Sequence, residues 1–329
     1  METINISLIN VVFGPVPSRR LGRSLGVNNI PPPKTCSYSC IYCQLGRTRN
    51  LLVQRRSYYD ARVLARTVQE RLENLTADID YITFVPDGEP TLDIALEKEV
   101  RLIRNFSNTP IAILTNSSLI FREDVRRDLL EFDLVSIKLD TGSERVWRRI
   151  NRPHPALSFE KILEGMKAFR KEFSGKIISE TMLVKEVNVD ESELEEISER
   201  ISVIEPDKAY LSIPIRPPAE SWVAPPSEEK IIEAYERFAE VLGKHRVELL
   251  TGYEGAGFEL AVDPAESILN ITAVHPMKLD YAWQALSEIV QDPGKIIDEL
   301  LASGKLKLIN YRGESFLIRR LVKSDSVQT

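Results

Sequence analysis

The sequence predicts an α/β protein whose main part is a partial (β/α)6 barrel, followed by a smaller α+β domain. Between residues 24 and 215, short apolar segments of strand length alternate with segments of helical periodicity. The chain has 329 residues, of which 43% are hydrophobic and 28% are charged, an ordinary globular composition with room for about two domains. The predicted strands are residues 25–30, 79–85, 111–115, 134–139, 177–184 and 209–215.

Amphipathic helices separate these strands. Four aliphatic residues between Leu64 and Leu75 are spaced by four and three positions, which places them on one face of a helix. The same spacing recurs within residues 162–173 and 194–204. A helix between consecutive strands requires parallel pairing through right-handed crossovers, as in a barrel. Because active sites of such barrels lie at the C-terminal ends of the strands, we expect the functional residues there.

The fourth predicted strand alternates apolar and polar residues. Its apolar positions 135, 137 and 139 share one face, and Ser136, Lys138 and Asp140 share the other. Because helices cover the outside of such a barrel, we expect the polar face to line the lumen, where a buried lysine and aspartate must be paired or solvated. Lys138 and Asp140 are therefore the candidate catalytic residues. We expect the fifth strand to present Ser179 and Thr181 to the lumen as well, with Glu180 on the opposite face.

A proline-rich segment, residues 214–226, ends the predicted barrel. An amphipathic helix follows within residues 231–242, and then a strand at residues 246–250. We therefore predict three units. They are a barrel at residues 1–226, which includes a basic N-terminal extension, a connecting helix and strand at residues 227–262, and a C-terminal domain at residues 263–329.

The C-terminal domain contains three predicted helices and a β-hairpin. The helices are residues 267–272, 279–290 and 296–302, and the strands are residues 305–310 and 315–320. This order resembles a winged helix-turn-helix, a module that binds DNA, RNA or protein, or serves only in packing. From residue 266 onward the chain has eight basic and eight acidic residues, and such neutrality does not favour binding to a phosphate backbone. We expect docking of a substrate protein or structural packing rather than DNA binding.

The charge of the chain is unevenly distributed. The total is −6, but residues 11–71 contain eleven basic residues against Asp60 and Glu70, a local charge of +9. This segment is expected to attract an anion, and the alternative is a solvated surface balanced by acidic helices elsewhere. No apolar run reaches the roughly 20 residues that cross a bilayer, and residues 1–10 lack the basic start of a secretory signal. We expect a cytoplasmic protein without membrane contact.

The chain has three cysteines, Cys36, Cys40 and Cys43. All of them lie inside the basic segment, within a stretch of eight residues. Disulfide pairing would leave one thiol over, and a tetrahedral zinc site would lack a fourth ligand because no histidine lies nearby. Three thiolates on a short loop suit an iron–sulfur cluster. With three ligands for four irons, one iron would stay open to a substrate or cofactor.

The CxxxCxxC spacing, with Tyr42 directly before the last cysteine, resembles the radical S-adenosylmethionine (SAM) superfamily. Downstream, Asp87-Gly88-Glu89-Pro90 is similar to the family's GGEP loop, with an aspartate in place of the first glycine. The resemblance implies a partial barrel of the radical SAM type and a [4Fe–4S] cluster on the cysteines. It also implies SAM chelated by the open iron and loop carbonyls that accept hydrogen bonds from the SAM amine. The aspartate is expected either to place a carboxylate near this amine or to alter the turn.

Three more polar residues sit where family members contact the ribose or adenine of SAM. Thr115 and Asn116 end the third predicted strand, and Asn188 follows the fifth. Capping of strand ends by short polar side chains explains each of them equally well. Residues 14–27 and 31–36 extend the resemblance to a mostly archaeal and bacterial group related to wyosine-type tRNA synthases. Most of this group has no assigned reaction, so the resemblance indicates the chemistry more firmly than the substrate.

The resemblance implies that an external electron donor reduces the cluster, and that a 5′-deoxyadenosyl radical from SAM abstracts hydrogen from a substrate in the lumen. The chain has no cysteine beyond position 43, so it cannot hold a second cluster on cysteines, which departs from the wyosine-type synthases. Three hypotheses remain. The substrate is RNA or a nucleotide, favoured by the basic segment, or it is a partner protein or peptide docked by the C-terminal domain. The third is a non-enzymatic DNA-binding regulator, which the motif at residues 87–90 argues against.

Overall fold

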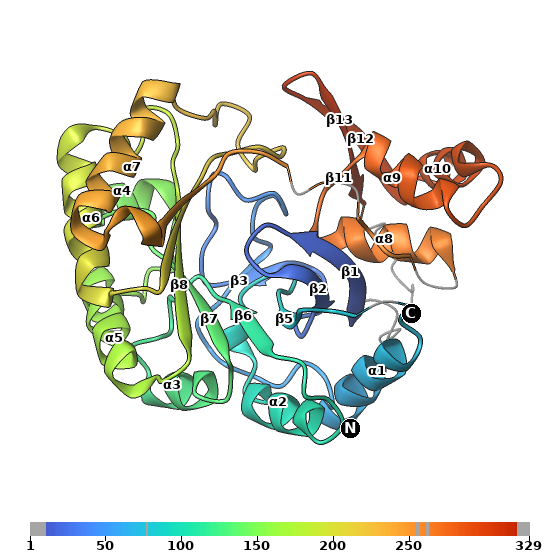
Figure 1. Ribbon diagram of the computed structural model, residues 1–329, viewed down its shortest axis with the longest axis horizontal. Helices are drawn as coiled ribbons and strands as arrows, with labels where there is room; N and C mark the ends of the chain where they lie inside the picture. Colours follow the sequence, from blue (N-terminus) through green and yellow to red (C-terminus); the bar gives the residue numbers. More distant parts are fainter. Residues whose placement is uncertain (1–10, 77, 254, 256, 261–262, 321–329) are drawn as a thin grey trace, which may run out of the picture.

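An eight-stranded sheet forms the centre of the protein (Figure 1), in a computed structural model that describes residues 11–76, 78–253, 255, 257–260 and 263–320. Its strand order is β1-β2-β5-β6-β7-β8-β9-β10, and from β2 onward every neighbouring pair is parallel. The strands are β1 Val12–Ser18, β2 Gly22–Val27, β5 Tyr81–Phe84, β6 Ile111–Leu114, β7 Leu134–Lys138, β8 Lys176–Met182, β9 Lys208–Ser212 and β10 Val247–Leu250. The sheet curls into a partial barrel, so the predicted fold class and its six parallel strands are confirmed.

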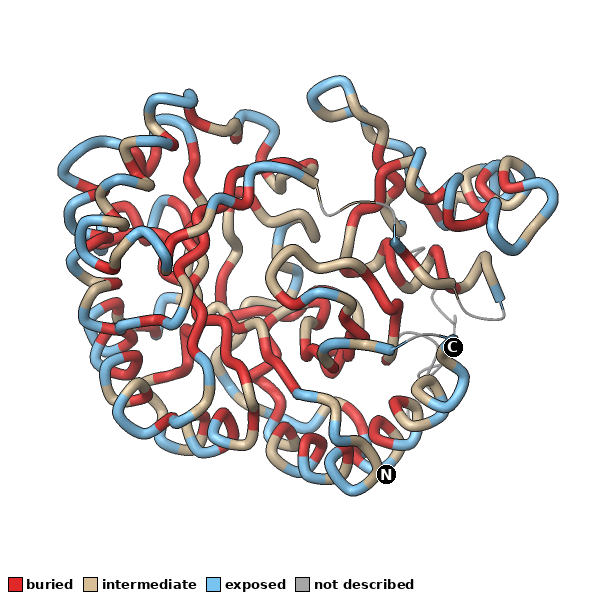
Figure 2. The backbone as a smooth tube through the Cα atoms, in the orientation of Figure 1, coloured by how far each residue is buried: buried red, intermediate tan, exposed pale blue. Residues whose placement is uncertain are grey.

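Helices follow the strands and cover the outer face of the sheet (Figure 1). They are α1 Ala61–Glu73, α2 Leu96–Arg104, α3 Glu123–Leu129, α4 Glu144–Ile150, α5 Phe159–Glu172, α6 Glu191–Ile204 and α7 Glu228–Leu242. The predicted apolar faces are buried, as Leu64 of α1 and Ile197 of α6 illustrate. Figure 2 shows that buried residues concentrate in the strands and along the inward sides of the helices. The main hydrophobic core therefore lies between the sheet and these helices.

The connecting helix and strand predicted at residues 227–262 extend the sheet. α7 and β10 follow the proline-rich segment, and β10 pairs in parallel with β9. The division into three units stays a prediction. Among the described residues, no helix is both long and apolar enough to traverse a lipid bilayer. The expectation about residues 1–10 lies outside the described residues.

Strand β1 was not expected from the sequence. It contains Gly14, Pro15 and Pro17, which are typical of a turn, yet it pairs antiparallel with β2 at the edge of the sheet. An edge strand tolerates proline because one side of the strand has no neighbour to receive its N–H groups. The register also shifts between Phe13 and Val16, as in a β-bulge. Local composition therefore favoured a turn, whereas pairing with β2 makes the segment a strand.

On β7, two of the three residues expected on the lumen face line a cavity and the third, Asp140, does not, while the expectation for β8 is wrong. On β7, the aliphatic positions 135, 137 and 139 are buried in the core under the helices, while Ser136 and Lys138 line a cavity. On β8, the residue that lines this cavity is Glu180. Ser179 and Thr181 point to the other face, where the Thr181 hydroxyl donates to the Leu139 carbonyl at 2.7 Å. The expectation for β8 was wrong because both of its faces carry polar residues, so alternation could not identify the lumen side.

The C-terminal domain has its own small sheet, in which β11, β13 and β12 pair antiparallel in that order. Its elements are α8 Pro264–Val274, β11 Met277–Lys278, α9 Leu279–Ser287, α10 Pro293–Ala302, β12 Leu306–Tyr311 and β13 Glu314–Arg319. The predicted helices and hairpin are present, and β11 was missed because it has two residues. The domain's core includes Phe13 and Val16 of β1, so it packs on that edge of the sheet, where Figure 1 shows α8 beside β1. Its assignment as a winged helix stays a prediction.

Candidate functional site

The cysteine loop is joined to the segment around Gly88 by backbone hydrogen bonds. Cys36 lies in β3 (Thr35–Cys36), which pairs with β4 (Asn50–Leu51). The Thr35 N–H donates to the Asp87 carbonyl at 3.1 Å, and the Glu89 N–H donates to the Thr35 carbonyl at 3.1 Å. Residues 87–90 follow the C-terminal end of β5 after two intervening residues. The two motifs predicted to act together therefore lie against each other at the carboxyl ends of the parallel strands.

The close approach of the cysteine loop to residues 87–90 explains why position 88 is a glycine. A Cβ added at Gly88 would lie 1.6 Å from the Thr35 carbonyl oxygen, a backbone atom that cannot move aside as a side chain could. No residue with a Cβ fits at this position without separating the two loops. Gly88 is therefore needed for the cysteine loop to reach its place beside residues 87–90.

The three cysteines line one cavity of about 180 Å³, together with Gly88, Glu89, Thr115, Asn116, Tyr42 and Lys138. Among the described residues, no three histidine, cysteine, aspartate or glutamate side chains are grouped so that they could hold a single metal ion. In an iron–sulfur cluster each thiolate binds a different iron, so the sulfurs need not converge on one point. Three thiols along one cavity therefore fit the ligand set of such a cluster. Burial raises the pKa of Cys36 to about 12 and that of Cys40 to about 11, so binding iron must displace protons.

Lys34 lies beside these thiols. Its Nζ donates to the Cys43 sulfur at 3.0 Å and to the Gly46 carbonyl at 2.6 Å. Burial lowers the pKa of Lys34, but its interactions with the three nearby cysteines together raise it more, so the net change is upward. A buried ammonium group therefore contacts a cysteine sulfur. The only sign of this contact in the sequence is that Lys34 lies close to the cysteines along the chain.

Glu89 anchors the second motif to the end of β6. Its Oε1 accepts from the Thr115 hydroxyl at 2.5 Å and from the Thr91 hydroxyl at 2.6 Å, and its Oε2 accepts from the Asn116 N–H at 2.7 Å. The side chain is 1% exposed, and its burial raises the pKa, which these hydrogen bonds partly offset. Thr115 and Asn116, both predicted to bind the cofactor, are thus held at the cavity wall by a glutamate predicted for the same role.

Two of the predicted cofactor-binding residues point away from the cavity. Burial raises the pKa of Asp87 to about 7; its backbone N–H donates to Asn28 Oδ1 at 3.0 Å, and the residue lines neither described cavity. Pro90 begins the short 3-10 turn η2 (Pro90–Leu92), and its carbonyl accepts from the Asn29 side chain at 3.2 Å. Of the two expectations for the aspartate, a carboxylate beside the SAM amine has no support in this geometry.

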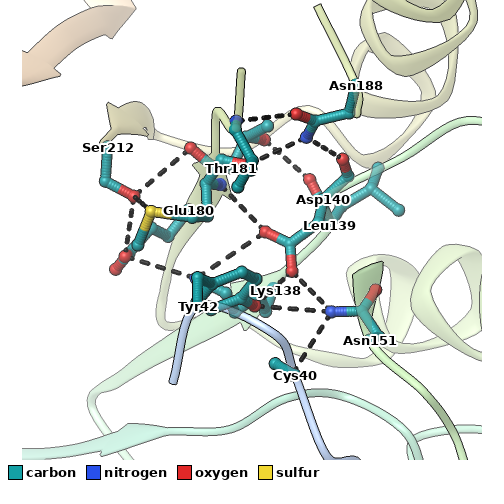
Figure 3. A network of polar contacts seen from close by, with 12 residues as sticks. Cys40, Tyr42, Lys138, Leu139, Asp140, Asn151, Glu180, Thr181, Asn188 and Ser212 are labelled. Carbon is teal, nitrogen blue, oxygen red and sulfur yellow. Dashed lines mark hydrogen bonds and ion pairs between the residues drawn. The ribbon is translucent and has the colours of Figure 1, made fainter. Parts of the chain in front are cut away.

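A polar network connects the cysteine loop with the ends of β7 and β8 (Figure 3). The Asp140 carboxylate accepts from the Tyr42 hydroxyl, from Asn151 Nδ2 at 2.7 Å and from the Met182 N–H at 2.9 Å. It lies 3.7 Å from Lys138 Nζ, and its side chain has no solvent exposure. Asp140 therefore orients neighbouring groups and does not line the cavities, although it was predicted to be catalytic together with Lys138.

Asn188 belongs to the same network (Figure 3). Its Nδ2 donates to the Asp140 and Met182 carbonyls at 2.7 and 2.8 Å, and its Oδ1 accepts from the Val184 N–H at 2.8 Å. The residue is fully buried and lines neither described cavity. Its amide is used in closing the turn after β8, which agrees with the strand-end alternative and not with contact to the cofactor.

Glu180 is a site residue that sequence reasoning missed. It pairs with Lys138 Nζ at 3.3 Å and with Arg20, and it accepts from the Ser212 hydroxyl at 3.0 Å (Figure 3). Lys138 and Glu180 are direct neighbours in the parallel register of β7 and β8. Periodicity within one strand carries no information about register, so this pairing was not visible in the sequence.

A second cavity of about 290 Å³ occupies the lumen of the barrel and its mouth. It shares Tyr42, Cys43, Leu114, Lys138 and Glu180 with the cavity of the cysteines. Of the described residues that line it, four are lysine or arginine and one is acidic. The cations are Arg19, Arg20, Lys138 and Arg216, and the acid is Glu180. Val274 and His275 of the C-terminal domain complete its wall.

The basic segment at residues 11–71 is partly balanced by acids from elsewhere in the chain. Arg47 pairs with Glu220 at 2.9 Å, and Arg55 pairs with Asp124 at 3.0 Å. Other arginines of the segment also contact carboxylates: Arg20 with Glu180 and Arg23 with Glu259. Of these four carboxylates only Asp124 lies on a helix, so the segment is balanced in part, but not mainly by acidic helices.

Comparisons with known proteins agree with this geometry. Residues 30–200 match the radical SAM superfamily. Over 320 residues the chain is 47% identical to a UPF0026 protein of Methanocaldococcus jannaschii, covering 96% of this chain and 98% of that protein. A structure of TYW1 with a lysine–pyruvate adduct bound has a TM-score of 0.50 and 15% identity, covering 69% of this chain and 82% of that chain. A structure of anSMEcpe with bound AdoMet and a peptide has a TM-score of 0.50 and 18% identity, covering 69% and 63%.

The likenesses to solved structures show the fold. The superfamily match and the UPF0026 relative show the family. The superfamily uses a [4Fe–4S] cluster and SAM, and its members are enzymes. The matched residues 30–200 contain all three cysteines and the motif at residues 87–90. This chain therefore belongs to the radical SAM superfamily, with UPF0026 proteins as its relatives.

Proposed function

We propose that this protein is an enzyme that holds a [4Fe–4S] cluster on Cys36, Cys40 and Cys43, cleaves SAM reductively and modifies a substrate bound in the lumen. When bound, the cluster and SAM supply a 5′-deoxyadenosyl radical that removes a hydrogen atom from the substrate. The observation that carries this proposal is that the two cavities share a wall made of Tyr42, Cys43, Leu114, Lys138 and Glu180. A cofactor on the cysteines and a substrate in the lumen would meet along this shared wall.

The chain's own residues would hold the reactants and limit access of water. The three cysteines would ligate the cluster, and the backbone at Gly88 and Glu89, which lines the same cavity, would bind the amino group of SAM. Tyr42 is buried between the two cavities and fixed by Asp140, so it would separate cofactor from solvent. The electron for this cleavage would come from an external donor.

For the substrate, we propose RNA or a nucleotide rather than a protein. Four cationic side chains and one carboxylate line the lumen cavity among the described residues, and phosphate groups are bound by lysine and arginine. A cavity of about 290 Å³ is at the lower end of the range for small ligands, so it would admit one nucleotide unit and not a folded RNA. A substrate RNA would therefore insert a single unpaired nucleotide.

The chemistry is tested with the full chain loaded anaerobically with iron and sulfide. We expect the wild type to bind iron, to give the electron paramagnetic resonance signal of a reduced cluster and to form 5′-deoxyadenosine from SAM with a chemical reductant. Each of the variants Cys36→Ser, Cys40→Ser and Cys43→Ser should lose SAM cleavage. Ser202→Ala, at a half-buried position of α6 that lines neither described cavity, serves as the control. A wild type that takes up no iron, or a cysteine variant that still cleaves SAM, contradicts the proposal.

The substrate class is tested by RNA binding and by mass spectrometry of nucleosides after incubation with total cellular RNA. We expect Arg216→Met to weaken RNA binding and to reduce the salt dependence by about one unit of slope, as for one lost phosphate contact. Arg62→Met removes a charge from the same basic segment at an exposed position of α1, outside the cavity, and should change neither. Equal losses in both variants would contradict RNA binding in the lumen cavity, and salt-resistant capture of one protein in place of RNA would favour the partner-protein alternative.

A further inference from the structure

Each of the three cysteine sulfurs receives a hydrogen bond from a different part of the fold. Lys34 Nζ donates to Cys43 at 3.0 Å, Asn116 Nδ2 to Cys36 at 3.4 Å and Asn151 Nδ2 to Cys40 at 3.4 Å. The donors precede β3, follow β6 and end α4, respectively. The lysine and Asn116 line the cysteine cavity, and Figure 3 shows the third contact, between Asn151 and Cys40. Every proposed cluster ligand therefore has one N–H donor in place.

The two asparagines are fixed so that their amide nitrogens face sulfur. The Oδ1 of Asn116 accepts from the Ser118 N–H at 2.9 Å, which leaves Nδ2 toward Cys36. The Nδ2 of Asn151 also donates to the Asp140 carboxylate at 2.7 Å, and a carboxylate cannot face the amide oxygen without repulsion. Both donors are neutral, and both contacts are longer than that of the lysine.

Lys34 differs from the asparagines because it carries a positive charge. It is 7% exposed, and its second described partner is the neutral Gly46 carbonyl at 2.6 Å. The other lysine that lines the cysteine cavity, Lys138, lies instead within ion-pair distance of Glu180 and Asp140. Hydrogen bonds from charged donors are shorter and stronger than neutral ones, and low dielectric strengthens the attraction between an ammonium group and negative charge.

We propose that Lys34 is a positioning residue that raises the reduction potential of the cluster through its hydrogen bond to Cys43. Reduction adds one negative charge to the cluster, and a buried ammonium group in contact with a ligand sulfur stabilises that charge. Hydrogen bonds to cluster sulfurs and nearby charge are among the factors that set the potential of iron–sulfur proteins. The inference rests on the proposed function, since it requires that the cysteines hold a cluster.

The test is a redox titration of the reconstituted full chain without SAM, followed by electron paramagnetic resonance, with iron and sulfide content measured for each variant. In Lys34→Met we expect the ratio of reduced to oxidised cluster at a fixed potential to fall about tenfold, which is a shift of about 59 mV to lower potential for a one-electron couple. Lys34→Arg keeps the charge and should stay near the wild type. Lys167→Met, which removes an exposed lysine of α5, should not change the potential.

Different results would separate failure of this inference from failure of the proposed function. If the wild type assembles no cluster, the proposed function itself is contradicted. A fully loaded Lys34→Met with the wild-type potential overturns the role of Lys34 and leaves the proposed function intact. If Lys34→Met does not assemble a cluster, Lys34→Gln, which keeps an N–H donor without the charge, must show the lower potential. Failure of both neutral variants to assemble a cluster would also overturn the inference, because Lys34 would then be needed for assembly.

Discussion

Substituting Gly88 with alanine tests whether the two motifs depend on close backbone contact. The new Cβ would lie 1.6 Å from the Thr35 carbonyl oxygen, where ordinary contact begins at 3.4 Å, so the two loops must separate by the difference of 1.8 Å. That separation breaks both 3.1 Å hydrogen bonds between Thr35 and residues 87 and 89. Each bond contributes about 0.5–1.5 kcal/mol, and an unsatisfied buried partner adds about 1–3 kcal/mol. We expect Gly88→Ala to lower the free energy of unfolding by about 2–6 kcal/mol.

The assay is chemical denaturation of the metal-free chain under reducing conditions, followed by anaerobic reconstitution. Because Thr35 precedes Cys36 directly, the displaced loop should also take up less iron than the wild type. Gly252→Ala is the matched control, since an added Cβ there meets nothing within 4 Å. A Gly88→Ala protein that unfolds like the control, within about 0.5 kcal/mol, and binds iron normally would refute the reasoning.

Three further substitutions test other contacts. Burial raises the pKa of Asp87 from its ordinary 3.8 to about 7, so the folded protein loses stability as pH rises through 7 and this carboxyl ionises. Asp87→Asn should therefore have a higher melting temperature than the wild type at pH 8, and the difference should disappear at pH 4. Asn188→Ala removes three hydrogen bonds of a fully buried amide and should cost about 2–4 kcal/mol in urea denaturation; a smaller loss would mean that water replaces the amide. Tyr311→Phe removes the 3.0 Å hydrogen bond from β12 to the Pro214 carbonyl and should cost about 0.5–1.5 kcal/mol, measured by thermal unfolding; an unchanged melting temperature would show that the contact adds no stability.

Most of the fold could be predicted because its signals are local. Apolar runs and spacings of three and four residues gave the six parallel strands and the helices between them, and each depends on residues close together in the chain. β1 could not be predicted, because its glycine and prolines favour a turn and the strand exists through pairing with β2. Glu180 was assigned to the wrong face for a different reason: neither side of β8 is purely apolar, so alternation does not identify the side that lines the cavity.

The candidate site was predicted in part. The cysteines and the motif at residues 87–90 were identified from spacing, and Thr115 and Asn116 do lie at the cavity of the cysteines. Asn188, Pro90 and the carboxylate of Asp87 do not line it, because sequence position at a strand end does not determine where a side chain points. Asn151 was missed, although its amide contacts Cys40 from 111 residues along the chain.

The sequence by itself determined the chemistry: three thiols at a characteristic spacing and a glycine-containing turn after a strand identify the kind of cofactor, since both signals are contained within a few residues. The tertiary structure decided which charges face that cofactor. Lys138 meets Glu180 through the register of two strands, Lys34 meets Cys43 through the path of a loop, and the C-terminal domain reaches the lumen by packing on β1. Such contacts depend on the balance of packing across the whole chain, and no local pattern records them.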